Sequence, residues 1–191
     1  MDGQNRFKAG LADFGGLTYD HAPPSAAEQT MTIAIGERIP EATLNTLRDG
    51  VQAVTTADVF GNRKVVLFSV PGAFTPTCSA SHLPGFVEHL AQFEARGISV
   101  ACMSVNDAFV MDAWAKSQGV PASLTMLADG NAAFAKLLGL EFDASAFGMG
   151  LRARRFALFA DDGVVKVLNV DAPGEFKVSS AEAMLAAVPA D

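Results

Sequence analysis

The sequence predicts an α/β domain with a mixed central sheet flanked by helices. From Met31 onward, short apolar runs typical of buried strands alternate with amphipathic stretches of helical length. Three of the helical stretches end at glycines, Gly97, Gly119 and Gly139, as helices commonly do. Late in the chain, an Asp-Gly turn signal joins two apolar runs and predicts a β-hairpin.

The first strand and helix are expected on either side of a proline. The apolar run 65–70 has the composition of a buried strand, and Pro71 ends it. A helix is expected from about 76 to 96. It should kink at Pro84-Gly85, because proline has no backbone N–H and its ring crowds the preceding turn.

A chain of 191 residues is long enough for one domain with a substantial core.

The remaining helices and strands are predicted from the same capping residues, hydrophobic patterns and turn residues. In chain order we expect a strand at 98–105, a helix capped by Asn106 or Asp107 that reaches about 118, a strand at 124–127, a short helix at 131–138, a hairpin of strands 156–160 and 164–170, and a helix that begins at Ser179 or Ser180 and ends at 188.

The composition argues against several classes of function. The formal net charge is −7, so we expect no nucleic-acid groove, which needs clustered basic residues. No run of about 18 apolar residues is present, so no membrane contact is expected. Two cysteines and three histidines do not form a metal site, and we expect neither a metal nor another cofactor.

The cysteines also bear on the compartment. Cys78 and Cys102 are too few for a disulfide scaffold and do not form a CxxC pair. Free thiols indicate a reducing environment. Because the charged head and long apolar stretch of a secretory signal are missing, we expect a cytoplasmic protein.

Residues 1–30 differ from the rest of the chain. They contain four glycines and the pair Pro23-Pro24, with no sustained hydrophobic period. We expect a weakly ordered N-terminal extension, or a leader foreign to the protein, followed by a single domain over 31–191.

The segment Pro71-Gly-Ala-Phe-Thr-Pro-Thr-Cys78 joins the first buried strand to a helix, at the end of the strands where α/β proteins favour their sites. Thr75 can cap this helix, and Pro76 then occupies its first position, where the missing N–H costs nothing. Cys78 falls in the first turn, among free N–H groups and the positive end of the helix dipole, which favour a thiolate. Because the thiolate is the nucleophile, Cys78 is a candidate reactive group.

Two neighbours are candidate partners of Cys78. His82 follows it by four residues and shares its helical face, and the hydroxyl of Thr75 is within reach of the sulfur or of a bound oxygen. Each residue also has a simpler interpretation. A lone cysteine is often a small core residue, Thr75 a cap and His82 a structural hydrogen-bonding group.

The residues described so far resemble a known family. Together with His-Leu-Pro-Gly-Phe at 82–86, the segment is similar to the peroxiredoxin 5 (type II) subgroup of the peroxiredoxins, whose core pattern Pro-x-x-x-Thr-x-x-Cys is matched by Pro71, Thr75 and Cys78. Further matches cover roughly 31–188, at 104–110, 127–130, 152–156, 162–169 and 179–182. The resemblance implies a thioredoxin-like fold and a thiol peroxidase that reduces hydrogen peroxide and organic hydroperoxides.

The resemblance also implies roles for individual residues. Cys78 is the peroxidatic nucleophile, which becomes a sulfenic acid, and Thr75 and Pro71 support and shield it. The family arginine that precedes an aromatic residue on the next strand maps onto Arg155, beside Phe156. Further residues expected to line the substrate pocket are Gly72, Phe74, His82 and Phe147.

Two other arginines compete with Arg155. Along a strand, neighbouring side chains point to opposite faces, so Arg154 should point away from Arg155 and lie on the solvated surface. Arg152 should precede the strand proper, so alternation does not define its direction. Arg152 is therefore the reserve candidate.

The reductant is a separate question. Cys102 is the only possible resolving cysteine, but it lies in the apolar run 99–105, and buried strand thiols are usually inert. Mammalian members of the subgroup resolve with a C-terminal cysteine, which 171–191 lacks. The tail is more similar to plant and bacterial members, often recycled by glutathione or glutaredoxin. We expect that route, with recycling by thioredoxin through Cys102 as the alternative.

Two other functions are less consistent with the sequence than a peroxidase, and the resemblance also implies a dimer. A thiol–disulfide oxidoreductase would need the missing CxxC pair. A non-catalytic binding or holdase protein would have no need of Thr75, Cys78 and Arg155 together. The family commonly forms dimers through the active-site end, so we expect a homodimer, with candidate contacts at Phe74, Phe109 and Phe147.

Overall fold

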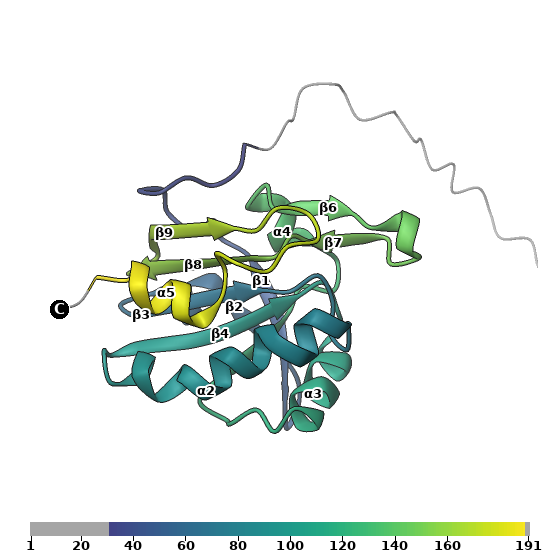
Figure 1. Ribbon diagram of the computed structural model, residues 1–191, viewed down its shortest axis with the longest axis horizontal. Helices are drawn as coiled ribbons and strands as arrows, with labels where there is room; N and C mark the ends of the chain where they lie inside the picture. The colour runs from purple at the N-terminus through teal and green to yellow at the C-terminus, as the bar shows by residue number, and fades with distance from the viewer. Residues whose placement is uncertain (1–30, 190–191) are drawn as a thin grey trace, which may run out of the picture.

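A seven-stranded mixed sheet forms the centre of the molecule, in the strand order β2-β1-β5-β4-β3-β8-β9 (Figure 1). The structure is a computed structural model that describes residues 31–189; the segment 1–30, expected as an extension or leader, lies outside the described residues. In chain order the elements are β1 (Thr43–Arg48), β2 (Gly50–Thr55), α1 (Thr56–Phe60), β3 (Lys64–Ser69), the π-helical turn Cys78–His82, α2 (Leu83–Glu94), β4 (Ile98–Ser104), α3 (Ala108–Ser117), β5 (Thr125–Ala128), α4 (Ala133–Leu137), β6 (Glu141–Asp143), the 3-10 turn Ser145–Phe147, β7 (Leu151–Ala153), β8 (Phe156–Asp161), β9 (Val164–Val170) and α5 (Ala181–Ala187).

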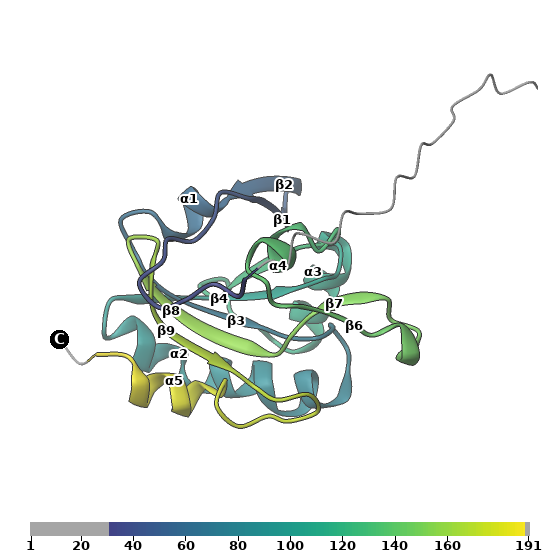
Figure 2. The ribbon, with the colours of Figure 1, turned by 90° about the horizontal axis from the view of Figure 1, so that it is seen from above.

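Helices cover both faces of the sheet, which confirms the predicted architecture. Helices α2, α3 and α5 share one buried cluster with alternate strand residues such as Phe68 and Cys102. Helices α1 and α4 pack on the other face, in a second cluster that contains Phe60 and Phe134. Figure 2 shows α2 and α5 side by side on one side of the sheet and α1 on the opposite side.

The pairing of β3 decides which loops meet. β3 is parallel to β4, and β4 is parallel to β5, so the three strands end at the same edge of the sheet. β8 runs antiparallel to β3, with Phe156 opposite Ser69. The residue that enters β8 therefore lies beside the loop that leaves β3, although the two are far apart in the sequence.

Several turn and cap signals are confirmed. Asp107, rather than Asn106, caps α3 by accepting from the Val110 N–H at 2.9 Å. Ser180 caps α5 in the same way. The hairpin between β8 and β9 turns at Asp162 and Gly163, both with positive φ (46° and 72°), as its Asp-Gly signal predicts.

The β1–β2 hairpin and α1 were not predicted. β2 is an edge strand with almost every residue exposed, so it carries little of the apolar alternation that marks a strand. Two local signals are nevertheless present. Asp49-Gly50 stands at the hairpin turn, and Thr55 and Asp58 form the capping box of α1.

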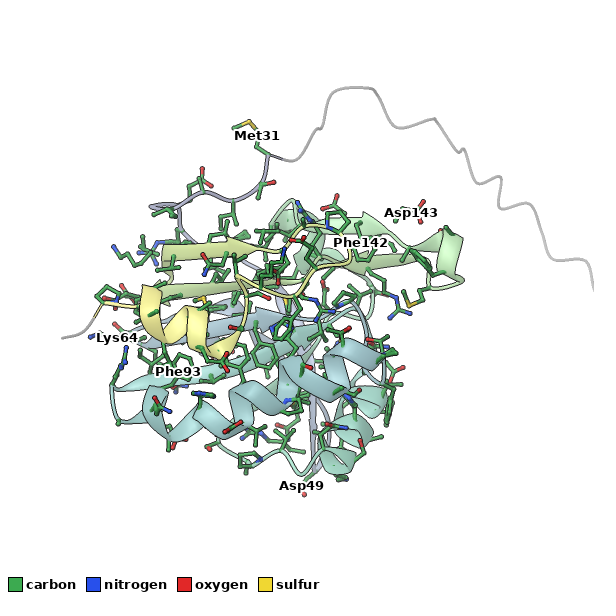
Figure 3. The ribbon with its side chains drawn as sticks, in the orientation of Figure 1. Met31, Asp49, Lys64, Phe93, Phe142 and Asp143 are labelled. Atoms are coloured by element: carbon green, nitrogen blue, oxygen red, sulfur yellow. The ribbon has the colours of Figure 1, made fainter. Side chains whose placement is uncertain are left out.

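A second, two-stranded ribbon was also missed. β6 and β7 have three residues each, too few to show a period, and they pair antiparallel with Phe142 opposite Arg152. The ribbon extends from the body of the molecule, and Phe142 and Asp143, labelled in Figure 3, lie on it. It brings apolar side chains to the edge of the sheet where β3 ends.

The helix that follows β3 contains a widened turn instead of a simple kink. Helical structure begins at Pro76, and over Cys78–His82 it is π-helical, with the Leu83 N–H donating to the Cys78 carbonyl. Pro84 explains the irregularity, because its ring and missing N–H are incompatible with a regular turn at this point. Such π-helical turns are frequent at functional sites. Within 31–189, no helix is long and apolar enough to cross a bilayer.

Candidate active site

The loop from Pro71 to Thr75 is tied to the end of β4. The Ala73 N–H donates to Oδ1 of Asn106 at 3.0 Å, and the same oxygen accepts the hydroxyl of Ser104 at 2.7 Å. Asn106 thus anchors the loop. The sequence suggested it only as a helix cap, because a bond to a loop more than 30 residues away leaves no local signal.

Phe74 and Gly72 constrain the shape of this loop, the first through its backbone conformation and the second through close packing. Phe74 adopts positive φ (63°), which is a strained conformation for a large side chain, and its ring is exposed. A Cβ at Gly72 would lie 3.1 Å from Thr75 Cγ2. Both residues therefore shape the loop, and neither lines the cavity described below.

Thr75 makes a different hydrogen bond from the one expected of a cap. Its hydroxyl donates to the Gly72 carbonyl at 2.8 Å, which closes the loop on itself. The hydroxyl oxygen can still accept a hydrogen bond through its lone pairs. The Thr75 carbonyl accepts the first helical hydrogen bond, from the Ser79 N–H at 3.0 Å.

Cys78 lies in the first turn of the helix, as predicted. Because the first helical hydrogen bond starts at Ser79, the N–H groups of Thr77 and Cys78 precede the bonded part of the helix. The Cys78 side chain is fully buried, so its sulfur depends on protein groups for polar contacts.

Arg155 supplies such a contact. Its Nη2 donates to the Cys78 sulfur at 3.6 Å, and its Nη1 lies 3.0 Å from Nδ1 of His82. One guanidinium thus bridges two residues that are four positions apart on the helix. His82 shares the face of Cys78, as predicted, but the two are linked through Arg155. Of the arginines at 152, 154 and 155, Arg155 is the one whose guanidinium contacts the Cys78 sulfur.

His82 is fully buried and neutral. Burial, and then the positive charge of Arg155, lower the pKa of His82 from 6.5 to about 3. Because arginine can only donate, Nδ1 of His82 is the acceptor, and Nε2 carries the proton and donates to the Ser179 carbonyl at 3.0 Å. His82 was expected in the substrate pocket. It lies instead beside Arg155 and is not among the residues that line the cavity.

The aromatic ring of Phe176 covers the Arg155–His82 pair. Its centroid is 5.6 Å from Cζ of Arg155 and 4.8 Å from the His82 ring. Phe176 belongs to the loop between β9 and α5, as does Ser179. No signal in the sequence pointed to Phe176, and Ser179 was expected only as a helix cap.

The other two arginines have their own partners. Arg152 lies within β7 rather than before a strand, and it donates to the carbonyls of Met149 (2.8 Å) and Val105 (3.0 Å). Arg154 was expected on the solvated surface, and this is wrong. It is half-buried, lines the same cavity as Arg155 and donates to the Asp171 carbonyl at 3.4 Å. Strand alternation does not apply to it, because residues 154 and 155 form the link between β7 and β8.

A cavity of about 460 Å³ opens beside these groups. Cys78 is not among the residues that line it, but two lining residues are neighbours of Cys78: Thr77 precedes it in the chain, and Arg155 contacts its sulfur. Phe147 is the most exposed large aromatic residue of the lining. The complete lining consists of Pro71, Thr77, Phe142, Phe147, Met149, Arg154, Arg155, Asp171, Ala172, Pro173, Gly174 and Glu175.

Cys102 lies in β4, in the same core cluster as Cys78, and both are free thiols. Its side chain is fully buried. That burial, with a smaller contribution from Cys78, raises the pKa of the Cys102 thiol well above its usual range. Among residues 31–189, no group of three histidine, cysteine or acidic side chains could hold a metal ion.

The buried neutral His82 makes stability depend on pH. Between about pH 6.5 and 3 the unfolded chain binds one more proton at this site than the folded chain, so the free energy of unfolding falls as the pH falls. His82 contributes up to about 1.4 kcal/mol per pH unit in this window. We expect urea unfolding of His82→Gln to show a shallower decline than the parent.

The half-buried His89, which bonds the Gly85 carbonyl, provides the control variant His89→Gln. This variant should keep the parent's decline. An identical pH dependence in His82→Gln and the parent would contradict the assignment of a neutral, buried His82.

The sequence comparisons agree on one family. Residues 34–185 match the family model described as Redoxin. The chain is 51% identical over 170 residues to Peroxiredoxin-2E-2, chloroplastic, of Oryza sativa subsp. japonica, covering 85% of this chain and 76% of that protein. It is 44% identical over 159 residues to Peroxiredoxin-2B of Arabidopsis thaliana, covering 82% and 98%.

Solved structures lead to the same family. Reduced Prx3 of Vibrio vulnificus in complex with hydrogen peroxide is similar, with a TM-score of 0.78, 50% identity, and 82% and 99% of the two chains covered. Peroxiredoxin 5 from Alvinella pompejana has a TM-score of 0.72 and 32% identity, over 81% and 97% of the chains. The fold is therefore thioredoxin-like, and the chain belongs to the redoxin family, in the peroxiredoxin 5 (type II) subgroup of the peroxiredoxins.

Proposed function

We propose that Cys78 is the peroxidatic nucleophile of this peroxiredoxin, and that Arg155 and Thr75 prepare its reaction with hydrogen peroxide and organic hydroperoxides. The observation that carries the proposal is the contact between Arg155 Nη2 and the Cys78 sulfur at 3.6 Å. A permanent cation beside a buried sulfur, at the positive end of a helix, favours the thiolate over the thiol. The same guanidinium offers further N–H groups to a peroxide oxygen.

The chemistry then follows from the local groups. The Cys78 thiolate attacks one peroxide oxygen, so an S–O bond forms as the O–O bond breaks. Negative charge develops on the departing oxygen, where Arg155 and the free N–H groups of the first helical turn can stabilise it until it takes a proton. The products are an alcohol or water and a Cys78 sulfenic acid. Pro71, at the cavity wall, limits access of water to the sulfur.

The cavity supports organic hydroperoxides as substrates in addition to hydrogen peroxide. Phe142, Phe147 and Met149 give it an apolar side, whereas Arg154 and Arg155 lie at its polar side. A hydroperoxide with an apolar substituent can place its O–O group at Arg155 and its substituent along the aromatic residues.

Turnover of hydrogen peroxide by Cys78→Ser tests the proposal. Because serine is a far weaker nucleophile and is not ionised at neutral pH, we expect no turnover above the background of the reductant. Cys102→Ser is the matched control, since it removes a buried thiol from the same core cluster. Peroxide consumption by Cys78→Ser at the parent rate would refute the proposal.

We propose further that an external thiol, glutathione with glutaredoxin, reduces the sulfenic acid. Two thiols of the reductant are oxidised to a disulfide, and the sulfenic oxygen leaves as water. The burial of Cys102 within β4 and the raised pKa of its thiol support this route, because a resolving cysteine must reach the sulfenic sulfur as a thiolate. Thioredoxin with Cys102 as the resolving cysteine is the alternative.

We therefore expect Cys102→Ser to keep nearly full peroxidase activity with glutathione plus glutaredoxin. Coupled assays with glutaredoxin and with thioredoxin, run on the parent and on the variant, measure this. Mass spectrometry of the peroxide-treated parent is the second readout. An intramolecular disulfide in the parent, together with loss of activity in the variant, would establish the alternative route.

We propose that the protein forms a homodimer through the active-site edge of the sheet. Three large aromatic side chains near this edge are exposed: Phe74 (56%), Phe109 (64%) and Phe147 (77%). Exposed apolar groups of this size in one region favour association. Sedimentation of the full chain should give a dimer that Phe109→Asp weakens, and a parent that sediments as a monomer would contradict it.

A reducing compartment fits two free, buried thiols, and we propose the cytoplasm. Some relatives have other compartments in their names, such as chloroplastic for Peroxiredoxin-2E of Arabidopsis thaliana and mitochondrial for Peroxiredoxin-2F. Imaging of the tagged full-length chain in its own cells distinguishes these compartments.

A further inference from the structure

The loop between β9 and α5 contacts both Arg155 and His82. It supplies the Phe176 ring over the pair and the Ser179 carbonyl that accepts from His82 Nε2. The loop itself has no regular secondary structure apart from turns. Its position therefore depends on specific contacts.

A single carboxylate makes most of those contacts. Asp171 is only 3% exposed. Its Oδ1 accepts the backbone N–H groups of Lys177 (2.9 Å) and Val178 (2.8 Å), and its Oδ2 accepts the hydroxyl of Ser179 at 2.5 Å. The three bonds hold consecutive residues, so they determine where the Ser179 carbonyl lies.

Asp171 also reaches Arg155 directly. Its backbone N–H donates to the Arg155 carbonyl at 3.0 Å, which pairs the end of β9 with the entry to β8. A continuous path of hydrogen bonds thus runs from the Asp171 carboxylate through Ser179, Nε2 and Nδ1 of His82, and Nη1 of Arg155, to the sulfur of Cys78.

The direction of each bond on this path is determined. Because the Ser179 carbonyl can only accept, it keeps a proton on Nε2 of His82. Nδ1 then has a free lone pair for Arg155. The opposite tautomer would place an N–H against the guanidinium, and a protonated ring would add a second positive charge beside it. The charged groups that act on His82 are Arg155 and Asp171.

We propose that Asp171 is a positioning residue for the peroxidase reaction, because it orients the Ser179 carbonyl, which selects the His82 tautomer that holds Arg155 on the Cys78 sulfur. The inference rests on the proposed role of Arg155. Asp171 touches none of the reacting atoms and acts through Arg155.

Asp171→Asn is the direct test, since it preserves the size of the side chain but replaces one accepting oxygen with a donor. Loss of one buried hydrogen bond is worth about 1.4 kcal/mol, so we expect Cys78 to react with hydrogen peroxide roughly tenfold more slowly. The measurement is single-turnover oxidation in a Cys102→Ser background, quenched and followed by mass spectrometry. Alkylation of Cys78 by iodoacetamide at one fixed pH should also become slower.

Asp129→Asn is the matched control. Asp129 is equally buried and also accepts backbone N–H groups, those of Phe134 and Ala135, but it has no part in the path to Cys78. Asp129→Asn should reduce the free energy of unfolding while leaving the oxidation rate and the alkylation rate of Cys78 unchanged. An oxidation rate in Asp171→Asn equal to that of this control would overturn the inference.

A double-mutant cycle separates positioning from a general loss of structure. If Asp171 acts through Arg155, the pair Asp171→Asn with Arg155→Ala should react no more slowly than Arg155→Ala alone. Multiplicative effects of the two substitutions would overturn the inference. His82→Leu removes the acceptor for Arg155 together with the donor towards Ser179, and in a cycle with Arg155→Ala it should show the same coupling.

The cycle also distinguishes failure of the inference from failure of the proposed function. If Arg155→Ala reacts slowly with hydrogen peroxide and Asp171→Asn reacts at the parent rate, only the proposed role of Asp171 is wrong. If Arg155→Ala reacts at the parent rate, the proposed role of Arg155 is wrong and the inference is wrong with it. Arg152→Ala, measured in parallel, then tests the remaining arginine.

Discussion

The bridge formed by Arg155 is the interaction on which the candidate site depends. One planar guanidinium contacts the Cys78 sulfur and Nδ1 of His82 at once, and it does so in a largely buried setting where an unpaired charge would be costly. Arginine suits this position because its donors are rigidly spaced and its charge is permanent. A lysine would offer a compact charge but could not join the two partners in one plane.

Most polar groups around the Arg155 bridge are hydrogen-bonded to other protein groups. His82 is neutral because burial and Arg155 both oppose its protonation. That neutrality is useful, since only a neutral imidazole can accept from the guanidinium. Asp171 and Asn106 play similar parts on two loops, where each uses a side-chain oxygen to accept hydrogen bonds from loop residues. The site is thus held by loops that are themselves held by single polar side chains.

The sequence predicted those structural features that depend on residues close together in the chain. The apolar run of β3, the Thr75-Pro76 helix start and the glycine stops are contained within a few residues, and the structure agrees with each of them in position. β2, β6 and β7 were missed because an exposed edge strand and two three-residue strands bury too little to leave a hydrophobic period. Arg154 was misplaced because alternation was applied to a link that is not a strand.

By itself, the sequence determined that Cys78 stands at the start of a helix after a buried strand, and its motif resembled one family closely enough to select Arg155. Only the tertiary structure decided how the distant groups combine. The antiparallel pairing of β8 with β3 brings Arg155 to Cys78, and the loop after β9 brings Asp171 and Ser179 behind His82. Contacts between residues separated by 70 or more positions depend on strand order and loop path, and neither helix geometry nor local composition encodes them.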